Sequence, residues 1–124
     1  MFIYCITSGE LTELNNGATT SRGYGYSGLD AGKNNPRMIQ VMGVGPIPPG
    51  HYQIGVPFTS PKSGPVTMAL SPEPGTDTYG RSGFEMHGDS KEHPGQASHG
   101  CIIMPPWVRK LVAAALDREL LVVV

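Results

Sequence analysis

Apolar and polar residues alternate over several short runs of the chain, and this pattern predicts a protein built mainly of β-strands. Each run is rich in β-branched or aromatic residues, which favour strands. In the third run, Tyr52 and Ile54 fall on one face, and His51 is expected at the surface. The turn residues Ser8-Gly9-Glu10 predict a hairpin between the first two runs. The runs are residues 2–7, 11–14, 51–56, 66–70 and 121–124.

The spacing changes near the C-terminus, where Pro105 and Pro106 can occupy the first turn of a helix. Apolar residues then recur at helical spacing, with charged residues on the opposite face. Trp107 belongs to the apolar set, so we expect it to anchor the helix in the core. The apolar set is Trp107, Leu111, Val112, Ala115, Leu116 and Leu120, and the polar set is Arg109, Lys110, Asp117, Arg118 and Glu119.

The longest connections are rich in glycine, asparagine and proline. Residues 15–37 predict a long ordered loop with one short strand, and as an alternative this loop walls a substrate groove. Three prolines within residues 41–50 fix φ and remove backbone donors, so this part should be a stiff extended connector. Residues 71–80 predict a further loop.

The chain has 124 residues, which is the size of one domain, so we expect residues 1–124 to form a single unit. Its 17 glycines and 12 prolines make nearly twice the usual combined share of about 12%, which suits a turn-rich β fold. A formal charge of −1 without basic clusters argues against nucleic acid or a membrane surface as a partner. No signal peptide or membrane-spanning run is recognisable, so action outside the producing cytoplasm would need another export route.

Reactive side chains are concentrated in residues 81–104, where a polar stretch is flanked by the apolar runs FEM and CIIM. This pattern predicts a loop carried between two strands. A thiol, imidazoles and the backbone amides around Gly100 are the parts of an acyl-transfer site. The spacing does not decide which imidazole is the base. The segment holds three of the four histidines and one of the two cysteines: His87, His93, His99 and Cys101.

Other interpretations stay open from the residues alone. Imidazole and thiolate are good zinc ligands, although the usual paired spacing of zinc ligands is missing here. The same polar residues could also decorate a loop without chemistry. The other cysteine, Cys5, should be a small buried hydrophobe of the first strand, unless it pairs with Cys101 in a disulfide. The residues available to zinc are His87, Asp89, His93, His99 and Cys101.

The segment HGDSKEHPGQASHGCII resembles the signature of the L,D-transpeptidase catalytic domain, the YkuD-like family, in which an upstream His-Gly precedes Ser-His-Gly-Cys. The resemblance extends to YSG at 26–28, GKNNP at 32–36, GPIPPGHYQI at 45–54 and GRSGFEMHGD at 80–89. These motifs are similar to a small branch of type VI secretion effectors that attack peptidoglycan.

The resemblance implies a β-sandwich of this family's type with one C-terminal helix, and no cofactor or metal. It implies Cys101 as the nucleophile, His87 as the general base and His99 as a second histidine that shapes the site. The amides of Gly100 and Cys101 would stabilise the oxyanion. Candidate substrate contacts are Arg81, Asp89 and Ser98.

The implied substrate is the tetrapeptide stem of peptidoglycan. Cys101 would attack the carbonyl of the L-centre of meso-diaminopimelate and expel the terminal D-Ala. The acyl-enzyme would pass to water, to a free D-amino acid or to another stem. A zinc hydrolase or a non-catalytic peptidoglycan-binding module are the alternatives.

One position departs from the family pattern. The larger family usually has an arginine two residues after the cysteine, where this chain has Ile103, and Arg81 or Arg109 would have to replace it. An effector is well served by trimming tetrapeptides, because trimming removes donors for cross-linking. The resemblance also implies export by a secretion system, action in the periplasm of a target bacterium, and a cognate immunity protein.

Overall fold

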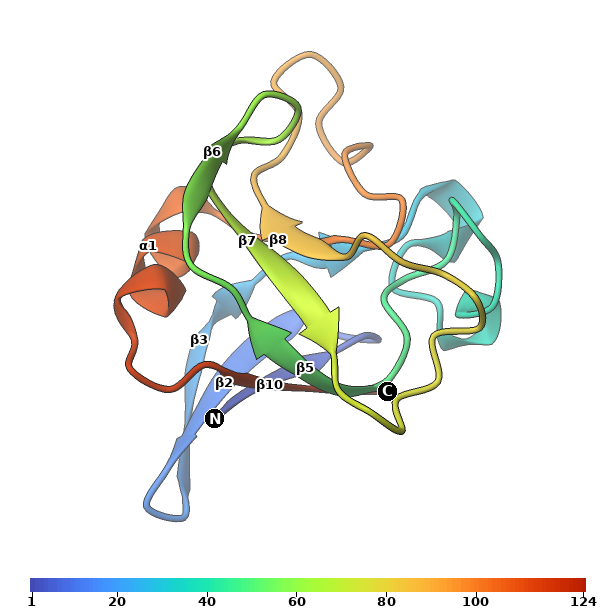
Figure 1. Cartoon of the computed structure of the whole chain (residues 1–124). Helices are drawn as coiled ribbons and strands as arrows, with labels where there is room; N and C mark the ends of the chain where they lie inside the picture. The colour runs from blue at the N-terminus through green and yellow to red at the C-terminus, as the bar shows by residue number, and fades with distance from the viewer.

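The computed structural model describes residues 1–124 as a chain of short strands with a single α-helix near the C-terminus (Figure 1). The prediction of a mainly β fold with one C-terminal helix is confirmed. The elements in chain order are β1 (Phe2–Cys5), β2 (Glu10–Asn15), β3 (Ala18–Tyr24), β4 (Tyr26–Ser27), the 3-10 turns η1 (Asp30–Gly32) and η2 (Pro36–Met38), β5 (Gly50–Ile54), β6 (Phe58–Ser60), β7 (Gly64–Pro72), β8 (Glu85–His87), β9 (Ile102–Ile103), α1 (Pro106–Ala114) and β10 (Glu119–Val123).

The strands form one continuous sheet in the order β3-β2-β1-β10-β5-β7-β8-β9-β4, with β6 paired to β7 beside this path. The β1–β10 and β8–β9 pairs are parallel, and the other pairs are antiparallel. The strand expected at 121–124 is confirmed as part of β10, which lies between β1 and β5. The C-terminal segment is therefore held in the middle of the sheet.

The two edge strands of this sheet, β3 and β4, are consecutive in the sequence, with only Gly25 between them. The Gly25 N–H donates to the Gly9 carbonyl at 2.8 Å. A Cβ at Gly25 would lie 1.8 Å from the Ile103 carbonyl oxygen, so only glycine fits. The sheet curls until its edges meet at this residue.

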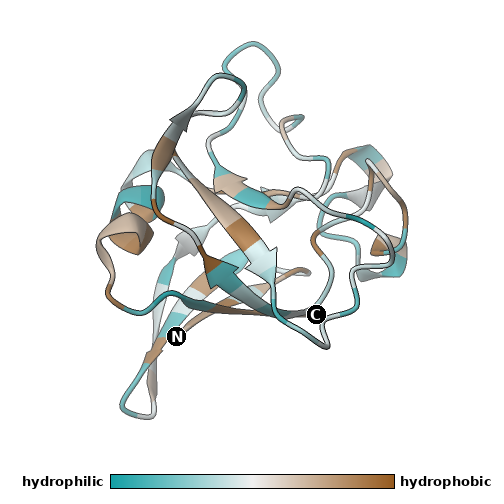
Figure 2. Cartoon of the chain, in the orientation of Figure 1, coloured by the Kyte–Doolittle hydropathy of each residue, from teal (hydrophilic) through white to brown (hydrophobic).

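Residues from the strands are buried together in one hydrophobic core, as the sequence pattern predicted. Figure 2 shows hydrophobic and hydrophilic residues within the same strands. On β5, Tyr52 and Ile54 are buried while His51 is exposed. The helix α1 contributes Val108 and Val112 to the same core. Burial of an aliphatic side chain of this kind contributes about 1.5–3 kcal/mol. The helix is thus held against the sheet by one apolar edge.

The helix is shorter than its apolar spacing predicted. The Arg118 guanidinium donates to the carbonyls of Val112 and Ala115 at 2.8 and 3.1 Å, which satisfies free carbonyls at the helix C-terminus. Beyond this cap the chain leaves helical geometry, so Leu116 is 99% exposed and Leu120 is buried in β10. No helix in the chain is long and apolar enough to cross a membrane.

Two side chains at the start of α1 lie on unexpected sides. Trp107, expected in the core, is 59% exposed and lies across Gly23 of β3. Arg109, expected on the polar face, is buried, and it donates to the carbonyls of Met104 and Pro65 at 3.0 and 2.7 Å. Unpaired loop carbonyls inside the fold draw this charge inward, because a buried carbonyl needs a donor.

The prediction of a long loop over residues 15–37 is wrong in its extent, because β3 fills much of the segment and pairs with β2. Asn16 and Gly17 have positive φ values of 51° and 79°, which is the geometry of a two-residue hairpin turn. The segment expected to be a stiff extended connector or edge contains no strand over residues 41–49, but residues 41–45 form turns and bends rather than extended chain. Cys5 is free and only half-buried, so its predicted burial and the disulfide alternative are both wrong.

Three arginines without acidic partners hold the glycine- and proline-rich loops together. The chain's two ion pairs join Asp117 to the terminal ammonium and Glu13 to Arg22. The three arginines donate to backbone carbonyls instead of carboxylates. Hydrogen bonds from a charged donor are stronger than bonds between neutral groups. These arginines are Arg81, Arg109 and Arg118.

Candidate active site

The strand pairing of β8 with β9 brings the expected thiol and imidazole to one face. The two strands are parallel, with Met86 opposite Ile102 and His87 opposite Ile103, so Cys101 lies one step before β9 and opposite Glu85. Side chains two residues apart on a strand share a face. Glu85, His87 and Cys101 therefore converge. Figure 1 shows β8 and the long loop that follows it.

The convergence is close. A carboxylate oxygen of Glu85, a ring nitrogen of His87 and the Cys101 sulfur all lie within 4.8 Å of one another. His87 is buried, and its Nδ1 lies 2.8 Å from the Gly88 carbonyl oxygen. A carbonyl only accepts, so Nδ1 carries the proton and Nε2 is left with its lone pair. His87 is thus prepared to take a proton through Nε2.

The thiol is neutral in its resting state. Burial raises the pKa of Cys101 to about 11, and the Glu85 carboxylate adds to this rise. The Glu85 backbone amide and the Arg81 guanidinium act in the opposite direction but do not cancel the burial. A thiol with this pKa needs a base beside it to react at neutral pH.

The turn before Cys101 is fixed by Ser98, which is completely buried. Its hydroxyl donates to the Cys101 carbonyl at 2.6 Å and accepts from the N–H groups of Gly28 and Gly100 at 2.9 and 3.2 Å. Ser98 was predicted as a substrate contact, whereas in the structure its hydroxyl binds groups inside the protein. The Gly100 N–H, predicted as an oxyanion donor, donates to this Ser98 hydroxyl. The next amide in the turn is the N–H of Cys101.

Arg81, the second predicted substrate contact, is buried and acts within the fold. Its guanidinium donates to four backbone carbonyls at 2.6–3.3 Å, which belong to Ile39, Gly45, Pro46 and His99. A Cβ on Gly100 would lie 2.6 Å from an Arg81 nitrogen, so Gly100 has to be glycine. Arg81 supports the turn that carries Cys101 rather than facing the solvent.

Asp89, the third predicted substrate contact, organises the loop between β8 and β9. Its carboxylate accepts from the Tyr26 hydroxyl at 2.6 Å and from the amides of Ser90 and Gly95 at 2.9 and 3.1 Å. Burial alone would raise its pKa, but these hydrogen bonds hold the pKa of Asp89 below its ordinary value. The carboxylate is charged at neutral pH and closes the loop on itself.

The structure does not bring His99 into the cluster of Glu85, His87 and Cys101. The His99 ring is exposed, and its Nδ1 lies 2.9 Å from the Gly43 carbonyl oxygen. It lines the same cavity as Cys101, so it can shape the site as expected without contacting the thiol. Of the five residues considered as zinc ligands, only His87 and Cys101 are grouped.

A cavity of about 1180 Å³ lies over the thiol. It is lined by the β6–β7 turn and by the loop that joins β8 to β9. The cavity is lined by Glu85 and His87 of β8 and by Cys101 just before β9. Arg109 of α1 also lines it. Drug-sized ligands need about 300–1,000 Å³, so this space accommodates a peptide.

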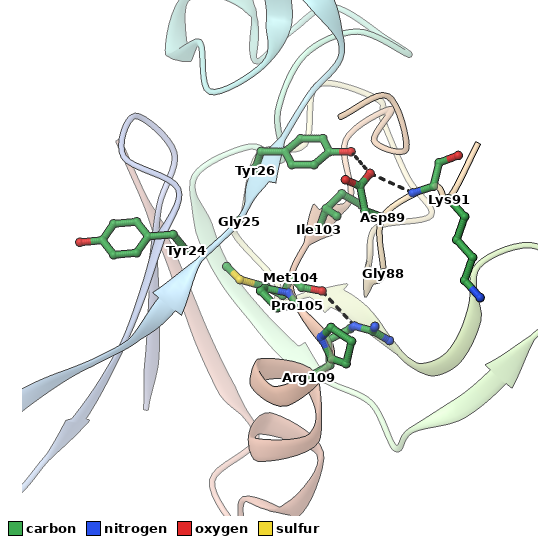
Figure 3. Close-up of a pocket in the computed structure, with 12 residues that line it drawn as sticks. Tyr24, Gly25, Tyr26, Gly88, Asp89, Lys91, Ile103, Met104, Pro105 and Arg109 are labelled. Atoms are coloured by element: carbon green, nitrogen blue, oxygen red, sulfur yellow. Dashed lines mark hydrogen bonds between the residues drawn. The ribbon is translucent and has the colours of Figure 1, made fainter. Parts of the chain in front are cut away.

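A smaller cavity of about 420 Å³ lies beside it and shares the wall made by residues 88–91 and Arg109. Figure 3 shows the Tyr26 hydroxyl pointing to Asp89 and the Arg109 guanidinium bonded to the Met104 carbonyl in this second cavity.

Sequence reasoning missed Glu85 as a member of the site. Its position two residues before His87 placed both side chains on one face of a strand. That signal was incomplete, because only the register of β8 against β9 sets Cys101 opposite Glu85.

Comparisons with known proteins show the family and the fold of the chain. The sequence profile of the Tlde1 domain matches residues 21–123. A mutant L,D-transpeptidase from Enterococcus faecium has a similar structure, with a TM-score of 0.61 and 17% identity, covering 98% of this chain and 48% of that protein. The Bd1075 protein from Bdellovibrio bacteriovorus has a TM-score of 0.59 and 14% identity, covering 97% and 46%. The chain thus spans about half the length of both, and the likeness shows the fold. No curated protein sequence gives a significant match.

Proposed function

Because the chain belongs to the Tlde1 domain family and has the fold of an L,D-transpeptidase, we propose that it is a peptidoglycan-modifying cysteine acyltransferase. One observation carries the proposal: the Cys101 thiol and the His87 ring lie together in a peptide-sized cavity. Imidazole and thiol at this separation are the parts of nucleophilic catalysis. The substrate is the tetrapeptide stem, which ends in diaminopimelate and D-Ala.

In the first half of the reaction, His87 Nε2 removes the thiol proton as the Cys101 sulfur attacks the diaminopimelate L-centre carbonyl. The bond from this carbonyl to the D-Ala nitrogen then breaks, and protonated His87 returns the proton to the leaving amine. The product is a thioester on Cys101. The raised pKa of Cys101 fits proton transfer during the attack rather than a preformed thiolate.

In the second half, water or the amine of a D-amino acid attacks the thioester, and His87 takes the proton from this nucleophile. The bond from the carbonyl to the Cys101 sulfur then breaks, and protonated His87 returns the proton to the sulfur. Water gives a tripeptide stem, and a D-amino acid gives an exchanged tetrapeptide. The oxyanion forms beside the Cys101 N–H, because Ser98 already binds the Gly100 N–H. One amide donor of this kind stabilises a transition state by about 2.7–4 kcal/mol.

Arg109 is the better replacement for the arginine that the larger family has at the position of Ile103. Ile103 is buried in β9. Both terminal nitrogens of Arg81 donate to loop carbonyls, whereas Arg109 binds carbonyls through Nε and Nη1 alone. Arg109 lines the cavity, and a Cβ on Gly88 would lie 2.8 Å from its terminal nitrogen. Its charge therefore lies next to the His87-Gly88 step, where it can attract a stem carboxylate.

The biological role follows from the family resemblance. We propose a type VI secretion effector that acts in the periplasm of a target bacterium and is neutralised in the producer by an immunity protein. Trimmed stems cannot serve as donors for cross-links, so the target wall weakens. Expression of the chain with a periplasmic export signal should stop growth of a susceptible host, whereas cytoplasmic expression should not.

The test of the activity is mass spectrometry of purified tetrapeptide stems incubated with the protein. The expected result is loss of the terminal D-Ala, or its exchange when a D-amino acid is added, and neither product with Cys101→Ala or His87→Ala. His51→Ala, on the exposed face of β5, is the matched control and should retain activity. Unchanged trimming by Cys101→Ala would overturn the proposal.

A further inference from the structure

Glu85 lies beside the candidate nucleophile but has no task in the acyl transfer described above. Its carboxylate shares the 4.8 Å cluster with His87 and Cys101. The three side chains offer one oxygen, one nitrogen and one sulfur, and each of these atoms is a good ligand for Zn²⁺. From this arrangement we propose that Glu85, His87 and Cys101 form a Zn²⁺ site.

The distances suit a tetrahedral ion. Zinc lies about 2.0–2.3 Å from nitrogen, oxygen and sulfur ligands, so ligand atoms in a tetrahedral site are roughly 3.3–3.8 Å apart. The three atoms are already within 4.8 Å of one another. The largest of these separations therefore has to shorten by only about 1 Å for the three atoms to share one tetrahedral ion.

Two of the three ligands, His87 and Glu85, are already held by partners outside the cluster. The His87 Nδ1 proton is bound by the Gly88 carbonyl, which leaves Nε2 to coordinate the ion. The Ser63 hydroxyl donates to Glu85 Oε1 at 3.3 Å, which orients the carboxylate from the β6–β7 turn. Metal-binding histidines and carboxylates are usually supported in this way.

The site has an entrance and a free fourth position. The three side chains line the cavity of about 1180 Å³, so a hydrated ion can reach them and keep one water. Binding replaces the thiol proton, which passes to solvent, by a metal–sulfur bond. This set differs from the sequence-based zinc set, since Glu85 joins and Asp89, His93 and His99 are absent.

Occupation of the site would switch off the proposed acyl transfer, and this consequence rests on the proposed function. The sulfur lone pair that attacks the stem carbonyl and the Nε2 lone pair that takes the proton are both used by the ion. The zinc-bound protein would therefore be inactive until the metal is removed.

The experiment uses the 124-residue chain carrying Cys5→Ser, so that Cys101 is its one thiol. Titration with Co²⁺ is followed by the near-ultraviolet sulfur-to-cobalt charge-transfer band, and competition with Zn²⁺ gives the Kd. We expect one ion per chain, no band after Cys101→Ser, and a Kd for Zn²⁺ raised at least about tenfold by Glu85→Gln. His51→Ala, an exposed histidine outside the cluster, should bind as the parent does.

Absence of the band in the parent, or a Kd unchanged by Glu85→Gln in a variant with a native thermal unfolding curve, would overturn the zinc site. The absorption measurement needs no substrate, so it separates the two proposals. A protein that binds Zn²⁺ but never trims stems keeps the site and refutes the proposed function. A protein that trims stems but shows no band does the reverse.

Discussion

Replacement of Arg81 by alanine should destabilise the protein and disturb the turn that carries Cys101. The guanidinium joins three separate segments through the carbonyls of Ile39, Gly45, Pro46 and His99. It also lies 5.6 Å from the centre of the Phe84 ring, within cation–π range. No other side chain supplies these contacts, so their loss is not compensated locally.

The expected magnitude follows from the burial of the acceptors. The Gly45 and Pro46 bonds are buried, whereas the Ile39 and His99 bonds are partly buried, where water can replace the donor. Each buried carbonyl left without a donor costs about 1–3 kcal/mol. With the smaller losses at the other two, Arg81→Ala should lower the free energy of unfolding by about 3–5 kcal/mol.

The assay is urea unfolding followed by circular dichroism. Arg22→Ala is the control, because Arg22 makes a partly exposed ion pair with Glu13, and such pairs contribute only about 0–1 kcal/mol. Arg81→Lys keeps the charge without the planar fork and should lie between the control and Arg81→Ala. A free energy of unfolding for Arg81→Ala within about 1 kcal/mol of the parent would refute the clamp.

Two further predictions concern the sheet closure and the thiol. Gly25→Ala should prevent folding or lower the free energy of unfolding in urea by more than about 4 kcal/mol, because its Cβ would lie 1.8 Å from a backbone oxygen. Gly55→Ala is the control, since its nearest contact is 3.4 Å, and it should change the free energy of unfolding by less than about 1 kcal/mol. Equal effects of the two substitutions would contradict the closure of the sheet at Gly25. Labelling of Cys101 by a thiol reagent, followed by peptide mass spectrometry, should keep accelerating above pH 10, because its pKa is raised from 9.0 to about 11. Glu85→Gln should shift this profile to lower pH, and a parent profile that is flat above pH 9 would contradict the raised pKa. The same shift stabilises the fold below pH 9, and this stability should be lost as the pH rises from 9 through 11.

The sequence predicted those elements whose local pattern matches their final environment. The strands around Phe2, Tyr52 and Leu70 alternate because one face of each packs on the core. The extent of β3 was missed, since its exposed residues alternate little and only the Asn16-Gly17 turn marked the hairpin. Strand pairing, rather than its own side chains, stabilises β3.

The length of the helix was overestimated for a different reason. The apolar residues from Leu116 to Leu120 continue the helical spacing, but the Arg118 cap ends the helix at Ala114. A cap supplied by a side chain after the helix cannot be told from an exposed charge in the sequence. The burial of Arg109 could not be predicted for a similar reason. One of the carbonyls that it binds belongs to Pro65, which is distant in the sequence.

Within the candidate site, the His87-Gly88 and His99-Gly100-Cys101 motifs identified the thiol and one imidazole. The roles of Arg81 and Ser98 could not be predicted, because both residues serve carbonyls or amides that meet only after folding. The candidate reactive side chains could be recognised in the sequence, whereas the hydrogen bonds that hold their turn could be recognised only in the folded structure.

In the proposed reaction, Cys101 forms a thioester with the stem peptide, and His87 enables this step by removing the thiol proton. The most direct measurement is the intact and peptide mass of the protein after rapid mixing with tetrapeptide and acid quenching. The expected result is an added mass equal to the stem minus D-Ala, on the peptide containing Cys101, and its absence in Cys101→Ser and His87→Ala. Stem trimming without this adduct, or an adduct on Cys5 alone, would contradict it.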